Sequence, residues 1–444
     1  MRTYETIALG IPDILLPRPG TDLRKWAVIA CDQYTSEPEY WEKVREFVGE
    51  APSTLHLIYP EVYLGESHPE ERILRIRETM QGYLEQGLFV EAEGLVYVER
   101  RTGHGTRRGL MVCLDLEHYD FRPGARSLIR ATEGTILERI PPRVKIREGA
   151  PLEVPHIMVL IDDPENTVIA PLADARDRLT RLYSFDLMME AGHLSGFRVD
   201  DPSLEQSVIK SLEALAEAES FSAKYDLPPE TPVLLYAMGD GNHSLATAKT
   251  IWEKTKETLE DEKSRRDSPL RYALVELVNL HDEALVFEPI HRVLFGLSDT
   301  GAPLEGMKTF YGKTFRYEPL STAEDMRKAV EDETQTAHRI GAISPEGFGL
   351  IEVEEPESNL PVGTLQNFLD SFLEDRRGVR IDYVHGAEPT IQLGAQSGCF
   401  GFYLPAMDKH ELFRTVILDG ALPRKTFSMG EAWEKRFYME ARRL

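Results

Sequence analysis

The stretch from Val233 to Lys249 changes its hydrophobic period midway, and this change constrains the fold more than any other feature of the sequence. Residues 233–237 form a short apolar run, typical of a buried strand, which stops just before Gly239–Gly241. From Asn242 onward the apolar residues recur with the spacing of a helix. The two glycines permit backbone angles that other residues resist. We therefore predict a strand, a tight glycine loop and a helix, in that order.

The start of such a helix favours an anion. Its first amide groups lack partners within the helix, and the helix dipole adds positive charge there. Asp240 could hold Mg²⁺ or Mn²⁺, or take a proton from an attacking hydroxyl, and His243 could contact a phosphate oxygen or carry a proton. Alternatively, Asp240 or Asn242 only caps the helix and His243 packs nearby. In the first interpretation the residues around a bound phosphate are Gly239, Gly241, Asn242 and Ser244.

A basic segment precedes this stretch in a chain whose net charge is −24. Its cations are Arg126, Arg130, Arg139, Arg143, Lys145 and Arg147. Arginine recognises phosphate or carboxylate with paired donors, so cations around the loop 132–135 suggest a small anionic ligand. Pro141 and Pro142 would stiffen this loop, and Glu133 would be held ionised and could act as a base. A solvated run of charge is the alternative.

Length and composition exclude several classes of protein. A chain of 444 residues exceeds one ordinary core, so two or three subdomains are expected. The acidic balance would repel a polyanion, and we expect no nucleic-acid partner. No apolar stretch is long enough to span a membrane and the first residues lack a signal peptide core, so we expect a cytoplasmic protein without a membrane partner. The three cysteines argue against a disulfide framework, and the sequence leaves open a monomer or a homodimer.

Three further predictions concern the rest of the chain. Strands at 94–101 and 109–116 are expected to form a hairpin. His291 and Arg292 follow a strand and could face the same pocket as the glycine loop, although such a pair more often lies on the surface. A charged terminal helix is expected from Glu431.

Four ordered motifs together resemble one family. They are Arg130-Ala-Thr-Glu-Gly-Thr135, the stretch 238–249, Pro289-Ile-His-Arg-Val293 and Pro423-Arg-Lys-Thr-Phe-Ser-Met-Gly430. This set resembles the domain-of-unknown-function family numbered 1015, over nearly the whole chain, and more distantly the ParB/sulfiredoxin-like group that includes free-serine kinases. The resemblance implies an α+β fold with mixed sheets: an N-terminal α/β region at 1–105, a ParB/sulfiredoxin-like core with the phosphate-binding turn at 106–300, and a C-terminal α+β region at 301–444.

The resemblance also implies an activity. Free-serine kinases convert L-serine to O-phosphoserine with Mg²⁺, and ATP, ADP or pyrophosphate is the expected donor. Asp240 and His243 match the kinase motif, and Glu133 would be the base for the serine hydroxyl. The other implied residues are Thr132 in the donor site and Thr135, His291 and Arg292 in the substrate site.

This sequence departs from the commoner form of the kinase motif. Asn242 stands in place of a histidine and Ser244 in place of an arginine. Loss of that arginine removes a bidentate phosphate contact, so one of Arg130, Arg139, Arg143 or Lys425 must compensate, or the donor must differ. Two other functions remain open: a nucleotide-binding sensor without turnover, and the reverse activity of a phosphoserine phosphatase.

Overall fold

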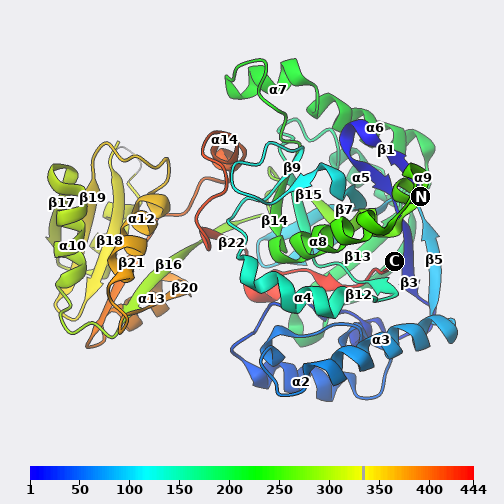
Figure 1. Cartoon of the computed structure of the whole chain (residues 1–444), viewed down its shortest axis with the longest axis horizontal. Coiled ribbons are helices and arrows are strands. Elements are labelled where there is room, and N and C mark those ends of the chain that lie inside the picture. Colours follow the sequence, from blue (N-terminus) through cyan, green and yellow to red (C-terminus); the bar gives the residue numbers. More distant parts are fainter. Residues whose placement is uncertain (333–335) are drawn as a thin grey trace. The chain divides into compact units, whose positions relative to one another are not determined.

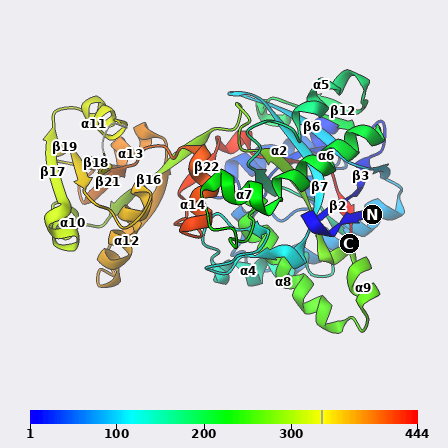
Figure 2. The same cartoon turned by 90° about the horizontal axis from the view of Figure 1, so that it is seen from above.

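The computed structural model describes residues 1–332 and 336–444, which form two compact units. Unit 1 comprises Met1–Val286 and Gly430–Leu444, and unit 2 comprises Phe287–Met429. Figures 1 and 2 show the elements of each unit. The boundary predicted near residue 105 falls within a hairpin of unit 1, and the boundary predicted near residue 300 falls inside unit 2.

Unit 1 is built on one mixed sheet. Its strands follow the order β12 (Thr180–Asp186), β13 (His193–Arg198), β6 (Val96–Thr102), β7 (Gly105–Asp115), β15 (Tyr272–Asn279), β11 (Met158–Ile161), β14 (Tyr236–Asp240), β9 (Ile129–Arg130) and β8 (Tyr119–Asp120). In addition, β2 (Leu9–Ile11) pairs with β7, and β1 (Arg2–Tyr4) pairs with β2. Strand β11 runs parallel to β15, and β14 runs parallel to β9, whereas β6 and β7 form the predicted antiparallel hairpin. The α+β class with mixed sheets is therefore confirmed.

Alternating apolar residues bury both faces of this sheet. In β7, Leu110, Val112 and Leu114 belong to one core, whereas Met111 and Cys113 belong to the other. Successive side chains of a strand point to opposite faces, so a continuous apolar run can serve two layers. One face is covered by α5 (Ala170–Asp174), α6 (Pro202–Leu215) and α8 (Asn242–Thr258), and the other by α2 (Pro38–Val48) and α3 (Pro69–Glu85) (Figure 1).

The C-terminal segment is mostly extended and packs inside unit 1, so the prediction of a terminal helix from Glu431 is wrong. A short turn at Ala432–Glu434 is followed by β23 (Phe437–Tyr438), paired with β4 (Val28–Ile29), and β24 (Arg442–Arg443), paired with β10 (Leu152–Glu153). Phe437, Tyr438 and Met439 are buried in the core that also contains α2 and α3. Burial of these apolar residues stabilises an extended chain over the local helical preference.

Smaller elements complete unit 1. They are α1 (Leu23–Trp26), β3 (Asp13–Pro17), β5 (Phe89–Glu93), α4 (Ile140–Arg147), α7 (Ala218–Tyr225) and α9 (Glu262–Asp267). The segment around Pro141 and Pro142 was expected to be a loop, but both prolines lie in the first turn of α4, where a missing N–H costs no hydrogen bond. Ile140 and Val144 of α4 pack against Ala246 and Ile251 of α8.

Unit 2 contains a second sheet with helices on both faces. Its strands follow the order β17 (Phe315–Leu320), β19 (Gly347–Val353), β18 (His338–Ser344), β21 (Cys399–Tyr403), β16 (Phe287–Phe295) and β20 (Arg380–His385), and β22 (Phe427–Met429) pairs with β16. Helices α10 (Ala302–Tyr311) and α12 (Pro361–Glu374) pack in one core, and α11 (Ala323–Val330) and α13 (Ala387–Gly394) pack on the other side; α14 (Leu412–Leu418) follows.

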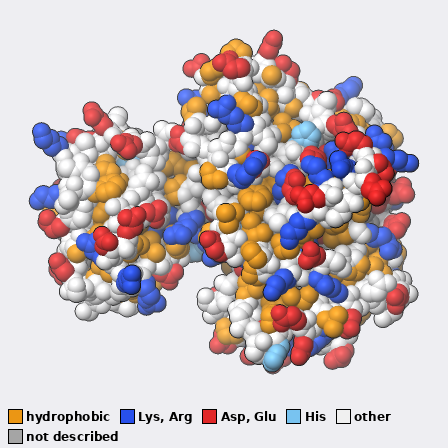
Figure 3. Space-filling model, in the orientation of Figure 1, with side chains coloured by type: hydrophobic (Ala, Val, Ile, Leu, Met, Phe, Trp, Pro, Cys, Tyr) orange, Lys and Arg blue, Asp and Glu red, His pale blue; other side chains and the backbone are white. Residues whose placement is uncertain are grey.

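Across the residues that the structure describes, no helix has both the length and the apolar composition needed to cross a membrane. Acidic and basic side chains alternate on the surface, as over α9, where Glu262, Lys263, Arg266 and Asp267 are exposed (Figure 3).

Candidate functional site

The predicted strand, glycine turn and helix are confirmed as β14, Gly241 and α8, with the strand shifted along the chain. Met158 of β11 pairs with Asp240 and Val159 pairs with Met238, so Gly239 is the extra residue of a β-bulge. Gly239 and Asp240 thus belong to the strand rather than to the expected loop. Gly241 has φ of +81°, and a Cβ there would lie 3.1 Å from the Cα of Ile157. Both facts require glycine at this position.

No side chain caps α8 at its start. The residue before the helix is Gly241, and Asp240 uses Oδ1 to accept the Gly241 N–H at 2.9 Å rather than an amide of the helix. The capping role weighed for Asp240 and Asn242 is therefore absent among the described contacts. The amide groups in the first turn of α8 lie at the positive end of the helix dipole, and no side-chain cap accepts from them among the described contacts.

Lys435 lies beside Asp240, which the sequence gave no reason to expect. Its Nζ is 3.3 Å from Asp240 Oδ2, and the side chains of Lys435 and Asp240 are 8% and 22% exposed. The neighbouring Arg436 fixes this segment, because its Nε donates to the carbonyl of Pro155 at 3.1 Å and its guanidinium pairs with Glu276 and Glu440. A buried cation and a carboxylate therefore meet at the end of β14.

The loop 132–136 packs against the same turn. Thr132 Oγ1 donates to the carbonyl of Met238 at 2.6 Å, and the N–H of Ile136 donates to His243 Nε2 at 3.2 Å. Because Nε2 accepts, a neutral His243 carries its proton on Nδ1. Glu133, the expected base, is half-buried within this loop. The sequence motifs around Glu133 and Asp240 thus come together.

Two polar atoms of these facing segments have no partner. Within residues 1–332 and 336–444, Thr135 Oγ1 and Asn242 Oδ1 are buried and make no hydrogen bond. Buried polar atoms are nearly always paired in native proteins, so each of these atoms offers a hydrogen bond to a ligand or a water molecule.

The arginines expected to compensate for Ser244 have other partners. Arg130 is buried, donates to the carbonyls of Ser127 and Pro232 at 2.8 and 2.7 Å, and has its pKa lowered to about 10 by burial. Arg143 pairs with Glu61 and donates to the carbonyl of Arg139, and the side chain of Arg139 is exposed. The geometry of these three arginines gives no support to a phosphate contact.

The remaining predicted site residues belong to unit 2. His291 is buried in β16, where Nδ1 accepts the N–H of Leu404 at 3.1 Å. Arg292 is also buried and donates to the carbonyl of Arg424 at 3.2 Å, whereas Lys425 is exposed. A contribution of these three residues to the site in unit 1 stays a prediction.

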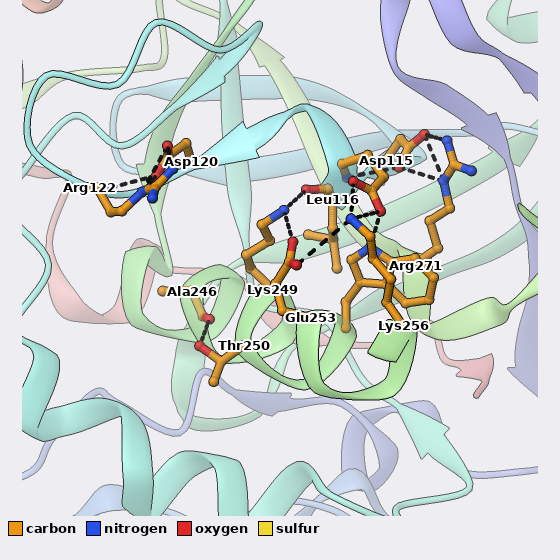
Figure 4. Close-up of polar contacts among 12 residues, drawn as sticks. Asp115, Leu116, Asp120, Arg122, Ala246, Lys249, Thr250, Glu253, Lys256 and Arg271 are labelled. Carbon is orange, nitrogen blue, oxygen red and sulfur yellow. Dashed lines mark hydrogen bonds and ion pairs between the residues drawn. The ribbon is translucent and has the colours of Figure 1, made fainter. Parts of the chain in front are cut away.

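Beyond its first turn, α8 is held against the sheet by hydrogen bonds and ion pairs of its lysines (Figure 4). Lys249 donates to the carbonyl of Leu116 at 2.8 Å, and Lys256 pairs with Glu117 at 2.8 Å, both in the short turn Leu116–His118 after β7. Next to them, Arg271 and Asp115 pair at 2.6 Å. These contacts fix the axis of α8 and hence the position of its first turn.

A chain of side chains leads from Ser244 into the core. Ser244 Oγ is 3.0 Å from His156 Nε2, and His156 Nδ1 is 2.9 Å from the hydroxyl of Tyr438. These residues, with Cys31, also line a cavity of about 130 Å³ that is otherwise mainly apolar. The sequence reasoning did not identify His156 or Tyr438, although the apolar residues around Tyr438 could have marked a buried segment.

A protein-only metal site is absent from the described part of the chain, because no three His, Cys, Asp or Glu side chains converge there. Asp240 nevertheless fits a magnesium ion brought in with a phosphate, since such an ion takes one or two carboxylates and fills its other positions with phosphate oxygens and water. Each carboxylate oxygen of Asp240 can accept more than the single contact described above.

Comparison with known proteins gives one family and several distant structures. The family described as "Protein of unknown function (DUF1015)" matches residues 15–372. No curated protein matches the sequence. Similar solved structures include a free serine kinase mutant in complex with ADP, with 10% identity, a TM-score of 0.39, and coverage of 74% of this chain and 90% of that chain.

Two other structures have comparable scores. A conserved hypothetical protein from Pyrococcus furiosus has 11% identity, a TM-score of 0.35 and the same coverage. A C-terminally truncated SbnI from Staphylococcus aureus has 8% identity, a TM-score of 0.36, and coverage of 72% of this chain and 81% of that chain. All three scores are too low to carry a functional conclusion, which must come from the residues of this chain.

Proposed function

The chain belongs to the family described as "Protein of unknown function (DUF1015)", and we propose that it is a phosphotransferase acting on a small hydroxyl compound. The leading acceptor is L-serine, with O-phosphoserine as the product and ATP, ADP or pyrophosphate as the donor. The observation that carries this proposal is the meeting of Asp240, Lys435 and the uncapped start of α8 beside the loop 132–136.

Phosphoryl transfer requires positioning and charge neutralisation more than covalent chemistry by the protein. In the proposed site, Lys435 and the first turn of α8 bind the donor's phosphate oxygens, and Asp240 would hold Mg²⁺. When bound, Mg²⁺ would neutralise charge on the transferring group. Glu133 takes the proton of the acceptor hydroxyl, and His243 can donate from Nδ1 because its Nε2 is occupied by Ile136.

The direct test is to incubate the protein with L-serine, Mg²⁺ and each donor in turn and to assay phosphoserine. Asp240→Asn should lower the rate by about 10²- to 10³-fold, since it removes a charge that acts on the transferring group. Asp186→Asn is the matched control, because Asp186 is an exposed carboxylate on β12, far along the sheet order from β14.

Three other results would change the proposal. Full activity of Asp240→Asn would contradict the role of this carboxylate. Protection of the protein against thermal unfolding by a donor, without product, would favour a nucleotide sensor. Release of phosphate from phosphoserine without any forward transfer would favour a phosphatase.

A further inference from the structure

The direction of the hydrogen bonds between Tyr438 and Ser244 follows from the groups that form them. The N–H of Cys31 donates to the Tyr438 hydroxyl oxygen at 3.1 Å. Tyr438 is 1% exposed, and burial raises the pKa of its hydroxyl well above the usual value, so the group keeps its proton. A phenol is a strong donor and an imidazole nitrogen is a strong acceptor, so the Tyr438 proton points to His156 Nδ1.

This donation fixes the other nitrogen of His156. With Nδ1 accepting, the neutral ring carries its proton on Nε2; a fully protonated ring carries a proton there as well. In either state the Nε2–H donates to Ser244 Oγ, 3.0 Å away. The hydroxyl proton of Ser244 must then point to a different acceptor.

Ser244 differs in this respect from the other hydroxyl residues of α8. Thr247, Thr250 and Thr255 each donate to the carbonyl four residues earlier, at 2.7, 2.8 and 2.9 Å; the Thr250 contact is drawn in Figure 4. The corresponding residue for Ser244 is Asp240, which lies in β14 rather than in the helix. With His156 Nε2 as the donor, no hydrogen bond described within residues 1–332 and 336–444 gives the Ser244 proton an acceptor.

We propose that Ser244 donates its proton to the anion bound at the start of α8, and that Tyr438, acting through His156, sets this direction. The inference rests on the proposed phosphate site and specifies its ligand: the group facing Ser244 accepts hydrogen bonds and donates none, as an ionised phosphoryl oxygen does. Ser244 is a binding residue, and His156 and Tyr438 are positioning residues.

The other groups around His156 agree with this direction. Asp32 Oδ2 lies 4.0 Å from Nε2, and a carboxylate there also favours a proton on that nitrogen. Glu61, the other carboxylate on this side, is paired with Arg143. Cys31 meets the Tyr438 hydroxyl through its side chain as well as its backbone N–H, but a thiol sulfur is a weaker acceptor than an imidazole nitrogen, so the Tyr438 proton still points to His156. The remaining neighbour on α8 is Ser244 itself.

The first test is calorimetric titration of the full-length protein with pyrophosphate in the presence of Mg²⁺. Ser244→Ala should weaken binding about 10- to 100-fold, because it removes a hydrogen bond to a charged group, and Ser244→Thr should restore most of the affinity. Thr247→Val is the matched control. Thr247 lies one turn further along α8 and lines the same cavity, but its hydroxyl donates to the main-chain carbonyl of His243. It should bind as the unaltered protein does.

The second test isolates the positioning role through the tautomer of His156. In the unaltered protein the nitrogen NMR signals of the His156 ring should show the proton on Nε2, whereas in Tyr438→Phe the neutral imidazole can place its proton on either nitrogen. Pyrophosphate binding by Tyr438→Phe should then weaken several-fold.

Each outcome separates the inference from the proposed function. Undiminished binding by Ser244→Ala would overturn the inference, while loss of transfer in Asp240→Asn would still support the phosphotransferase. An unchanged His156 tautomer in Tyr438→Phe, or undiminished pyrophosphate binding by that variant, would overturn the role of Tyr438. Absence of binding of pyrophosphate, ATP and ADP by the unaltered protein would overturn both proposals.

Discussion

Residues 1–332 and 336–444 contain two serine–histidine pairs that differ in the group on the far side of the histidine. On β12 and β13, Ser184 Oγ is 2.8 Å from His193 Nε2, and His193 Nδ1 is 2.7 Å from Asp186. At α8 the corresponding distances are 3.0 Å for Ser244 and His156 and 2.9 Å for His156 and Tyr438. The two chains differ in the third group, a carboxylate in one and a phenol in the other.

The third group decides which way the protons point. Asp186 can only accept, so His193 donates from Nδ1 and Nε2 accepts the proton of Ser184. Tyr438 donates, and the order reverses at Ser244. The first arrangement resembles the order of acceptors in a hydrolytic triad, but Ser184 and Asp186 are exposed on a strand at the edge of the sheet. The second arrangement lies at the uncapped start of α8, near the Lys435–Asp240 pair, and lines a cavity.

Of the changes considered, removal of the buried cation Lys435 should have the largest effect on ligand binding at α8. We expect Lys435→Met to weaken pyrophosphate binding about 30- to 100-fold, because a charged donor is lost and Asp240 loses its ion pair. The measurement is titration calorimetry with Mg²⁺ and pyrophosphate. Arg101→Met is the matched control, since Arg101 is an exposed cation on β6 that lies opposite His193 in the register of β6 and β13. A similar loss in both variants would show a general effect of charge rather than a site.

A third histidine, His291 in unit 2, can be compared with His156 and His193, because its burial disfavours the charged form of the imidazole. Burial, followed by the nearby Arg292, lowers its pKa to about 3. The unfolded chain therefore binds more protons than the folded one between pH 3 and about 6.5, and stability is lost as pH falls through this window. We expect hydrogen exchange at β16 and β21 to report a loss of stability between pH 8 and pH 5, to which His291 contributes about 2 kcal/mol.

The control for this prediction is His291→Gln, which keeps an acceptor for Leu404 but cannot be protonated in this range. It should reduce the pH dependence without removing it, because burial also lowers the pKa of His338 to about 4. An unchanged dependence in His291→Gln would contradict the assignment of the effect to His291.

The smallest expected effect is that of Asp186→Asn on ligand binding. His193 loses its acceptor in this variant, yet Asp186 and its partners are exposed and lie on strands far from β14 in the sheet order. Pyrophosphate affinity should stay within about twofold of the unaltered protein. A larger change, seen in the same calorimetric assay, would mean that the two chains of hydrogen bonds are coupled.

Local patterns predicted the local part of the site. The switch from an apolar run to helical spacing gave the order of β14, Gly241 and α8, and the family motifs drew attention to the loop 132–136. The strand boundary was shifted, because the bulge at Gly239 lets β14 continue to Asp240. The basic segment also led to the prediction that Arg130 binds phosphate, but Arg130 is buried and its guanidinium donates to main-chain carbonyls.

Contacts between distant parts of the chain could not be predicted in the same way. Lys435 and Tyr438 reach the site only because the last residues pair with β4 and pack in the core of unit 1. A single sequence shows charge and periodicity within a segment, but it does not show which segment another will meet. Here the terminal stretch was expected to be a helix, and that error concealed two of the residues around α8.

The most direct test of the phosphate site is a crystal structure of the protein with Mg²⁺ and pyrophosphate. We expect electron density for a phosphoryl group at the start of α8, with its oxygens in hydrogen-bonding distance of Ser244 Oγ and Lys435 Nζ and with Mg²⁺ on Asp240. Density for pyrophosphate at another place, with the start of α8 bearing only water, would contradict the account.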